Sequence, residues 1–278
     1  MKTENQTFNA GNFYLDKWFL DFVGENGEVM IFYAAKLYWS IWNVSYTSWL
    51  SYDPATGVCQ KSRFRNIHMP ENKNGTITWS DSQFGVAGYW KSSAIPVNAR
   101  IFDSGEGFLD WKCHQPASIV TLKFKEKTIK GIGYVEQLIL TVPPWKIPMD
   151  ELRWGRFGSG ENQMVWIELR TEEKRQWLWL NGEKIENCNI EDDHILVDGK
   201  DFMLKLNREV TLESEKKIFS VVEKLIRYMP GLNKIMPVKF LMAEECKWFS
   251  NGILLKGDSI IDRGTAIHEL VNFQPVIA

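Results

Sequence analysis

Cysteine is scarce in this sequence, and its placement points away from metal and redox chemistry. The 278 residues include 4 Cys, and no two of them form a C-x-x-C pair. That spacing excludes the usual zinc-ribbon and thioredoxin motifs, and no secretory signal is evident at the N-terminus. We therefore expect reduced thiols in a cytoplasmic protein.

Motifs for several common enzyme chemistries are also missing. There is no G-x-x-x-x-G-K-[ST] phosphate loop and no G-x-S-x-G nucleophile elbow, which argues against P-loop NTPases and α/β-hydrolases. Gly131-Ile132-Gly133 lacks the third glycine and the following helix of a dinucleotide site. The 4 His are scattered, so a metal site could be assembled only across strands. We expect no cofactor and no metal.

Neither a strongly basic surface nor a long apolar segment is evident. The formal net charge is −2 and the sequence pI is about 6.2, so the dense basic face that phosphate neutralisation requires is missing. No apolar run approaches the roughly 18–20 residues that a membrane-spanning helix needs. The sequence thus predicts a soluble protein with no nucleic-acid partner and no membrane span.

Aromatic residues and turns, by contrast, are abundant. Aromatics make up 13% of the chain, with 13 Trp. Short runs rich in Val, Ile, Phe, Tyr and Trp alternate with turn residues at 24–27, at 53–57 and at Asn181-Gly182, the strongest two-residue hairpin signal. Strands at such short spacing predict an all-β, antiparallel protein of the sandwich or barrel type.

The pattern divides into two similar parts. Three prolines within residues 142–148 exclude a central strand there and mark a rigid connection. We therefore predict two β-domains, residues 1–145 and 146–278. Lys17-Trp18-Phe19 and Lys247-Trp248-Phe249 form a weak internal echo that agrees with two similar halves.

One long helix is expected in the second half, over residues 215–229. Apolar residues follow helical spacing after Ser214, which is a suitable N-cap. Pro230-Gly231 then ends the run. We interpret this segment as a helix that covers a core.

Three carboxylates share strand faces with apolar residues. The faces are Phe19-Asp21-Val23, Tyr134-Glu136-Leu138 and Ile267-Glu269-Val271. Such an acid is either structural, satisfied by an arginine or by backbone donors, or lies in a dry cavity with a raised pKa and is available for proton transfer. Arg156 shares a strand face with Trp154, and we predict that it pairs with Glu136 or Glu269.

These same segments carry a resemblance to a known family. Gly-x-Gly-Tyr-x-Glu at 131–136, Trp-Gly at 154–155, the aromatic strand at 18–22 and Ile-His-Glu at 267–269 resemble the AttH and carotenoid hydratase (hydroxyneurosporene synthase) superfamily. The resemblance implies two lipocalin-like β-barrel domains packed together, with a ligand cavity in or between them. It also implies possible activities, since some members add water across an alkene and fungal relatives catalyse intramolecular cycloadditions.

The leading hypothesis is a protein that binds a hydrophobic, isoprenoid-like or polyketide-like molecule in an aromatic-lined cavity. As an enzyme it would be a cofactor-free hydratase or cyclase, in which a neutral carboxyl protonates an alkene and aromatic walls stabilise the cation. The alternatives are a non-catalytic carrier or sensor, and a carbohydrate-binding β protein that uses exposed Trp. The predicted catalytic residues are Glu136, Glu269 and His268, and the predicted ligand-binding residues are Tyr134, Trp154, Arg156, Trp166 and Asp21.

Overall fold

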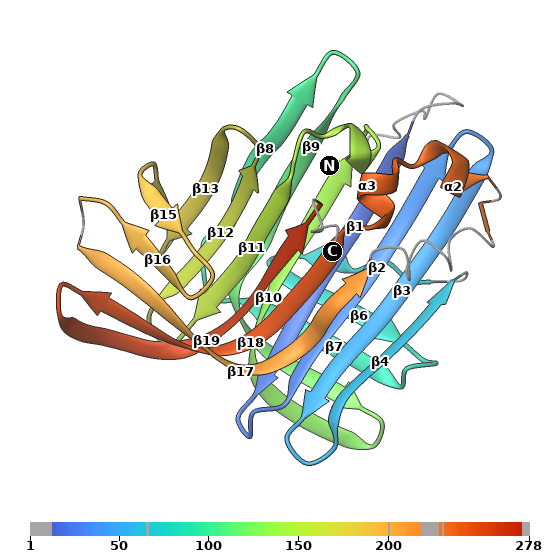
Figure 1. Cartoon of the computed structure of the whole chain (residues 1–278). Helices are drawn as coiled ribbons and strands as arrows, with labels where there is room; N and C mark the ends of the chain where they lie inside the picture. The colour runs from blue at the N-terminus through green and yellow to red at the C-terminus, as the bar shows by residue number, and fades with distance from the viewer. Residues whose placement is uncertain (1–12, 65–66, 200, 218–227, 230, 274–278) are drawn as a thin grey trace.

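The computed structural model describes residues 13–64, 67–199, 201–217, 228–229 and 231–273. The chain forms two large antiparallel sheets, one of them nearly barrel-shaped, and very little helix (Figure 1). The predicted all-β class is therefore confirmed. Each sheet is built from one continuous part of the chain, and the change of sheet falls between Leu140 and Glu151, where the prolines lie.

The first sheet contains ten strands. They are β1 Tyr14–Gly24, β2 Val29–Trp39, β3 Trp42–Asp53, β4 Gly57–Phe64, β5 Glu71–Lys73, β6 Thr76–Asp81, β7 Val86–Ser92, β8 Val97–Ser104, β9 Gly107–Phe124 and β10 Lys127–Leu140. Their order is β4-β3-β2-β1-β10-β9-β7-β6-β5, with β8 paired to β9 outside this path. The first and last strands of this part of the chain, β1 and β10, are therefore neighbours.

The second sheet contains nine strands. They are β11 Glu151–Gly158, β12 Gln163–Arg170, β13 Lys174–Leu180, β14 Glu183–Ile185, β15 Cys188–Ile190, β16 His194–Val197, β17 Phe202–Lys217, β18 Glu244–Lys256 and β19 Ser259–Asn272. Their order is β14-β13-β12-β11-β19-β18-β17-β16-β15. The predicted hairpin turn is confirmed between β13 and β14, where Asn181 and Gly182 have φ of 54° and 80°, as a type I′ turn requires.

The two sheets repeat one topology. The two strand orders match position by position when β1 is aligned with β11 and β10 with β19. β8 has no counterpart in the described part of the second sheet. Phe19 pairs in register with Glu136 in the first sheet. Trp154 of β11 pairs with Glu269 of β19 in the second. The two Lys-Trp-Phe tripeptides lie on β1 and β18, which do not correspond, so the repeat is one of topology and not of those residues.

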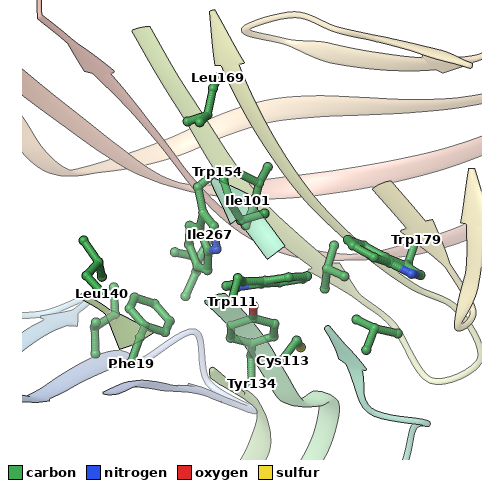
Figure 2. Close-up of a cluster of buried hydrophobic side chains, with 14 of the residues drawn as sticks. Phe19, Ile101, Trp111, Cys113, Tyr134, Leu140, Trp154, Leu169, Trp179 and Ile267 are labelled. Atoms are coloured by element: carbon green, nitrogen blue, oxygen red, sulfur yellow. The ribbon is translucent and has the colours of Figure 1, made fainter. Parts of the chain in front are cut away.

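Successive side chains of β1 pack alternately into two different hydrophobic cores. Trp18, Leu20 and Phe22 pack into a core made only of first-sheet residues. Phe19 and Val23, on the opposite face, pack into a core shared by both sheets (Figure 2). A further core lies wholly within the second sheet. The two-residue period of a strand therefore places half of β1 at the junction between the sheets.

Helix is confined, within the described ranges, to three short segments. These are the 3-10 helix η1 Pro144–Lys146 and the helices α2 Leu232–Ile235 and α3 Val238–Leu241. Figure 1 shows α2 beside the ends of β2 and β3, and its Leu232 belongs to a small core against which Trp39 and Trp42 pack.

The described residues contain no long helix, and the N-terminal boundary expected for the helix over 215–229 is wrong. Ser214 and the next three residues continue β17, because Lys216 and Lys217 pair in register with β18. Pairing with a long neighbouring strand outweighs local helical periodicity at this point. Residues 218–227 lie outside the described residues.

Two further expectations concern the membrane and the thiols. Within the described ranges, no helix has the length and apolar character needed to cross a bilayer. All four cysteines lie in those ranges and carry free thiols, as expected from their spacing.

Candidate functional site

The space between the two sheets is not filled along its whole length. Beside the aromatic cluster of Figure 2 there is a cavity of about 330 Å³. Its walls come from β1 to β4, from β17 and β18, from the proline connection and from Met229, Leu232, Met236 and Phe240. Most of its lining is aliphatic or aromatic. The polar lining residues are Lys17, Tyr33, Tyr46, Ser48, Gln60, Glu213 and Glu245.

A completely buried lysine lies behind the polar part of this wall. The Lys247 side chain is 0% exposed, and its Nζ lies 2.7 Å from Glu245 Oε1 and 3.1 Å from Glu213 Oε2. Glu269 Oε2 lies 2.9 Å from the same ammonium, which also donates to the Tyr33 hydroxyl at 2.7 Å. Tyr33 belongs to the first sheet and the other four residues to the second, so the cluster joins the sheets at the cavity.

Burial and mutual repulsion govern the protonation of this cluster. Burial raises the pKa of Glu245 above its ordinary value; Lys247 opposes the rise, and the two neighbouring carboxylates add to it. Burial alone would lower the pKa of Lys247, but the carboxylates and Tyr33 outweigh it and hold that pKa well above its usual range. Because three carboxylates share one buried ammonium, the cavity-lining Glu245 carboxyl is disposed to hold a proton.

Glu136 lies in the packed part of the junction and does not line the cavity. Its Oε2 accepts hydrogen bonds from the Tyr134 hydroxyl at 2.6 Å, from Trp154 Nε1 at 2.9 Å and from the Trp111 indole. Figure 2 shows these three aromatic side chains close together. Burial raises the pKa of Glu136, and the three donors oppose that rise. The carboxylate thus links β9 and β10 of the first sheet to β11 of the second.

The glycines of the Gly-x-Gly-Tyr-x-Glu segment allow close packing against β1. A Cβ at Gly133 would lie 2.3 Å from the Asp21 carbonyl oxygen, and one at Gly131 would lie 2.1 Å from the Val23 carbonyl oxygen. Trp90 Nε1 donates to the same Asp21 carbonyl at 2.7 Å. This segment therefore has a structural explanation that requires no ligand.

Arg156 pairs with a buried carboxylate, as predicted, but the predicted partner was wrong. Its Nε and Nη2 each donate to Asp21 at 2.8 Å in a bidentate pair, and both residues are at most 1% exposed. Burial raises the pKa of Asp21, and Arg156 opposes the rise. Arg156 reaches from β11 across to β1 of the other sheet, whereas Glu136 is held by aromatic donors and Glu269 by Lys247.

His268 and Trp166 lie away from the cavity. His268 is buried, its Nε2 is 2.8 Å from the Ser250 hydroxyl, and burial lowers its pKa to about 3. Trp166 packs in the core of the second sheet. The space beside these two residues measures about 10 Å³, which is about the volume of one water molecule.

The structure therefore brings six of the eight predicted site residues into three groups near the junction, and none of the eight lines the cavity. Tyr134, Glu136 and Trp154 form one hydrogen-bonded group, Asp21 and Arg156 form a second, and Glu269 joins Lys247 behind the cavity wall. A direct role of these residues in binding or catalysis stays a prediction.

The polar wall of the cavity was missed by sequence reasoning. Glu245 and Lys247 share one face of β18 with the buried Phe249, so they show the same pattern of charged residues on an apolar face that singled out Glu269. In addition, Lys247 pairs in register with both Glu269 and Glu213. The Lys-Trp-Phe echo drew attention to Lys247 without indicating its partners.

Tryptophan exposure separates two of the functional hypotheses. All 13 Trp lie in the described ranges, and none of them is exposed. A carbohydrate platform would require a row of exposed coplanar Trp. The buried and half-buried Trp favour an apolar cavity instead.

Comparisons with known proteins relate this architecture to solved structures. No family model matches the chain, and no curated protein matches its sequence. The AttH-type protein from Nitrosomonas europaea superposes with a TM-score of 0.55 at 8% identity, covering 99% of this chain and 97% of that one. CghA gives 0.55 at 10% identity over 94% and 88% of the two chains. Kievitone hydratase from Nectria haematococca gives 0.50 at 11% identity over 95% and 89%.

These likenesses establish a shared fold. The resemblance to AttH and hydratase proteins that the sequence motifs indicated is confirmed at that level: the chain has the lipocalin-like architecture of those structures. With identities of 8–11%, the likeness does not extend to activity or substrate.

Proposed function

We propose that this protein binds a hydrophobic small molecule, isoprenoid-like or polyketide-like, in the cavity between the sheets. The observation that carries the proposal is the cavity itself, about 330 Å³ of open space lined mostly by apolar side chains. Protein interiors are normally close-packed, and small-molecule sites are concave, mostly apolar and about 300–1,000 Å³ in volume. Among proteins of this fold, CghA has a solved structure with Sch210972.

Filling the cavity should displace the ligand. Ala35 of β2 lines the cavity, and Ala35→Phe places a ring in the volume that the ligand would occupy. We expect the amount of co-purifying hydrophobic molecule to fall by at least about tenfold, as for a loss of about 1.4 kcal/mol in binding. Denaturing extraction followed by mass spectrometry measures this amount.

A matched control is available in the β3–β4 turn. Ala55 is exposed there, so Ala55→Phe adds the same ring outside the cavity and should keep the wild-type load. Thermal melting establishes that both variants are folded. A folded Ala35→Phe protein that retains the wild-type load would contradict the proposal.

A second function, cofactor-free acid–base chemistry on an alkene, is favoured by Glu245. Its carboxyl lines the cavity, and burial raises its pKa. The protonated carboxyl would transfer its proton to one alkene carbon, and water would add to the cation on the adjacent carbon. The resulting oxonium would return a proton to Glu245, so the net change is addition of one water. Lys247, which is itself bonded to Tyr33, would keep the carboxyl in position. A hydratase, kievitone hydratase, has the same fold.

Glu245→Gln should abolish this chemistry while leaving binding in place. We expect wild-type protein in heavy water to introduce deuterium at carbon positions of its extracted ligand, and the variant to do so at least about 100-fold more slowly. Mass spectrometry reads the exchange. Glu244→Gln is the control, since Glu244 is the preceding residue of β18 and does not line the cavity. Wild-type protein that leaves its ligand unlabelled would contradict catalysis and support the carrier alternative.

A further inference from the structure

The cavity is elongated, and it follows the direction of β1 and β2. Alternate residues of β2, from Tyr33 to Trp39, line it, as do Phe13 and Lys17 beside them on the β1 side. With a rise of about 3.3 Å per strand residue, the six residue-to-residue steps from Tyr33 to Trp39 span roughly 20 Å. The cavity therefore has two ends that lie far apart, and their chemistry differs.

The end at Tyr33 is polar and has charged groups of both signs. Lys17 Nζ lies 5.0 Å from the centre of the Tyr33 ring, and the Tyr33 hydroxyl contacts Lys247. With the Glu245 carboxyl protonated, the carboxylates of Glu213 and Glu269 are balanced by Lys247 and Lys17, so this end offers no excess positive charge to a carboxylate on a ligand. A neutral hydrogen-bonding group, such as a hydroxyl, fits this end better.

The opposite end is closed by aromatic rings. Phe13 lies 5.8 Å from Trp39 and 6.4 Å from Trp145, measured between ring centres. Trp145, from η1 in the proline connection, in turn lies 5.9 Å from Phe240 of α3 in an edge-to-face contact. No charged group lines this end within the described residues.

Beyond this aromatic wall lies a second cavity, of about 180 Å³. The two cavities share Pro144, Trp145 and Phe240 as lining residues, so these side chains separate them. Phe273 lines only the second cavity and stacks on Phe240 with ring centres 5.5 Å apart. Trp145 and Phe240 are only half-buried, so truncating either one removes less packing than truncating a core residue.

We propose that the ligand is an elongated amphiphile with a neutral hydrogen-bonding group at one end, and that Trp145 and Phe240 form the wall that sets its maximum length. This inference rests on the proposed binding function and specifies the ligand class for the same site. The polar group lies at Tyr33, Lys17 and Glu245, and the tail points along β2 toward Trp39. Removing either wall residue joins the second cavity to the first.

The test uses straight-chain primary alcohols of increasing length as probes, with affinity measured by titration calorimetry. In the wild type, each added methylene should raise the affinity about fourfold, which corresponds to about 0.8 kcal/mol per buried CH₂. The rise should stop at the length at which the tail meets the wall. In Phe240→Ala, and independently in Trp145→Ala, the rise should continue to longer chains. Phe273→Ala removes an identical side chain from the second cavity alone and should keep the wild-type limit.

Carboxylates of the same chain lengths test the polar end. At neutral pH they should bind at least about tenfold more weakly than the alcohols, because this end has no excess positive charge to offset the hydration that a ligand carboxylate loses. Equal affinity of acids and alcohols would overturn the assignment of the polar end. An unchanged length limit in folded Phe240→Ala and Trp145→Ala would overturn the proposal that these two side chains set the maximum ligand length.

The failure of this inference is distinguishable from failure of the proposed function. If no alcohol binds, but a co-purifying molecule is present and is displaced by Ala35→Phe, the elongated ligand class is wrong and the binding function stands. If no alcohol binds and the molecule is not displaced by Ala35→Phe, both are wrong.

Discussion

Replacing Lys247 with methionine should lower the free energy of unfolding by about 3–5 kcal/mol. Methionine preserves most of the volume of the side chain but removes the ammonium that Glu213, Glu245 and Glu269 share. Three carboxylates would then lie close together in a buried setting without a counter-ion. Urea titration measures the loss, and Lys256→Met, at an exposed position of the same strand, should change stability by less than about 0.5 kcal/mol.

The deficit of the Lys247→Met protein should depend on pH in a defined direction. The pKa of Glu245 is already raised in the folded protein, and loss of the ammonium raises it further. A carboxyl with a raised folded-state pKa stabilises the fold below its unfolded pKa, and this stabilisation is lost as the pH rises through the folded pKa. The variant should therefore be closer to wild type at about pH 5 than at about pH 8. A deficit that grows on acidification would contradict this account.

Replacing Arg156 with leucine should destabilise the protein by about 3–5 kcal/mol, because it leaves Asp21 as an uncompensated buried charge. Both side chains are at most 2% exposed, and their atoms lie 2.8 Å apart. The pair also joins β11 to β1, so the two sheets lose a direct contact at their junction. Arg263→Leu, at an exposed position of β19, is the control and should be nearly neutral.

The double variant Asp21→Leu/Arg156→Leu distinguishes the cost of an unpaired charge from the value of the pair. Replacing both members of a buried ion pair by apolar residues is often neutral or stabilising, so the double variant should recover most of the stability lost in Arg156→Leu. If Arg156→Leu lowers the free energy of unfolding by less than about 1 kcal/mol, Asp21 is not left as an uncompensated buried charge in that variant. No recovery in the double variant would show that the pair has a specific structural role.

Several features of the fold follow from local sequence patterns. The two-residue alternation in β1 predicted which side chains face each core, since strand geometry sends successive residues to opposite faces. The turn at Asn181-Gly182 was predicted because both residues tolerate positive φ. The prolines of 142–148 predicted a break in the strands, and the chain changes sheet there. Acids on apolar faces were predicted to be buried, and Asp21 and Glu136 are.

Other features depend on how distant strands pack. Helical spacing after Ser214 predicted a helix, but pairing with β18 extends β17 to Lys217. The strand face that Arg156 shares with Trp154 predicted a buried carboxylate partner. It did not predict which carboxylate, because the choice between Asp21 and Glu136 depends on how β11 packs on the first sheet.

The sequence by itself determined the strands, their faces and the topological class, because these depend on neighbours within a few residues. Only the tertiary structure decided where the two sheets meet without filling the space between them. The cavity wall combines Tyr33 of one sheet with Glu213 and Glu245 of the other. The ammonium of Lys247 stays buried because residues more than 200 positions apart, Tyr33 and Lys247, are brought within hydrogen-bonding distance. No local pattern encodes that approach, since it arises from the packing of one complete sheet on another.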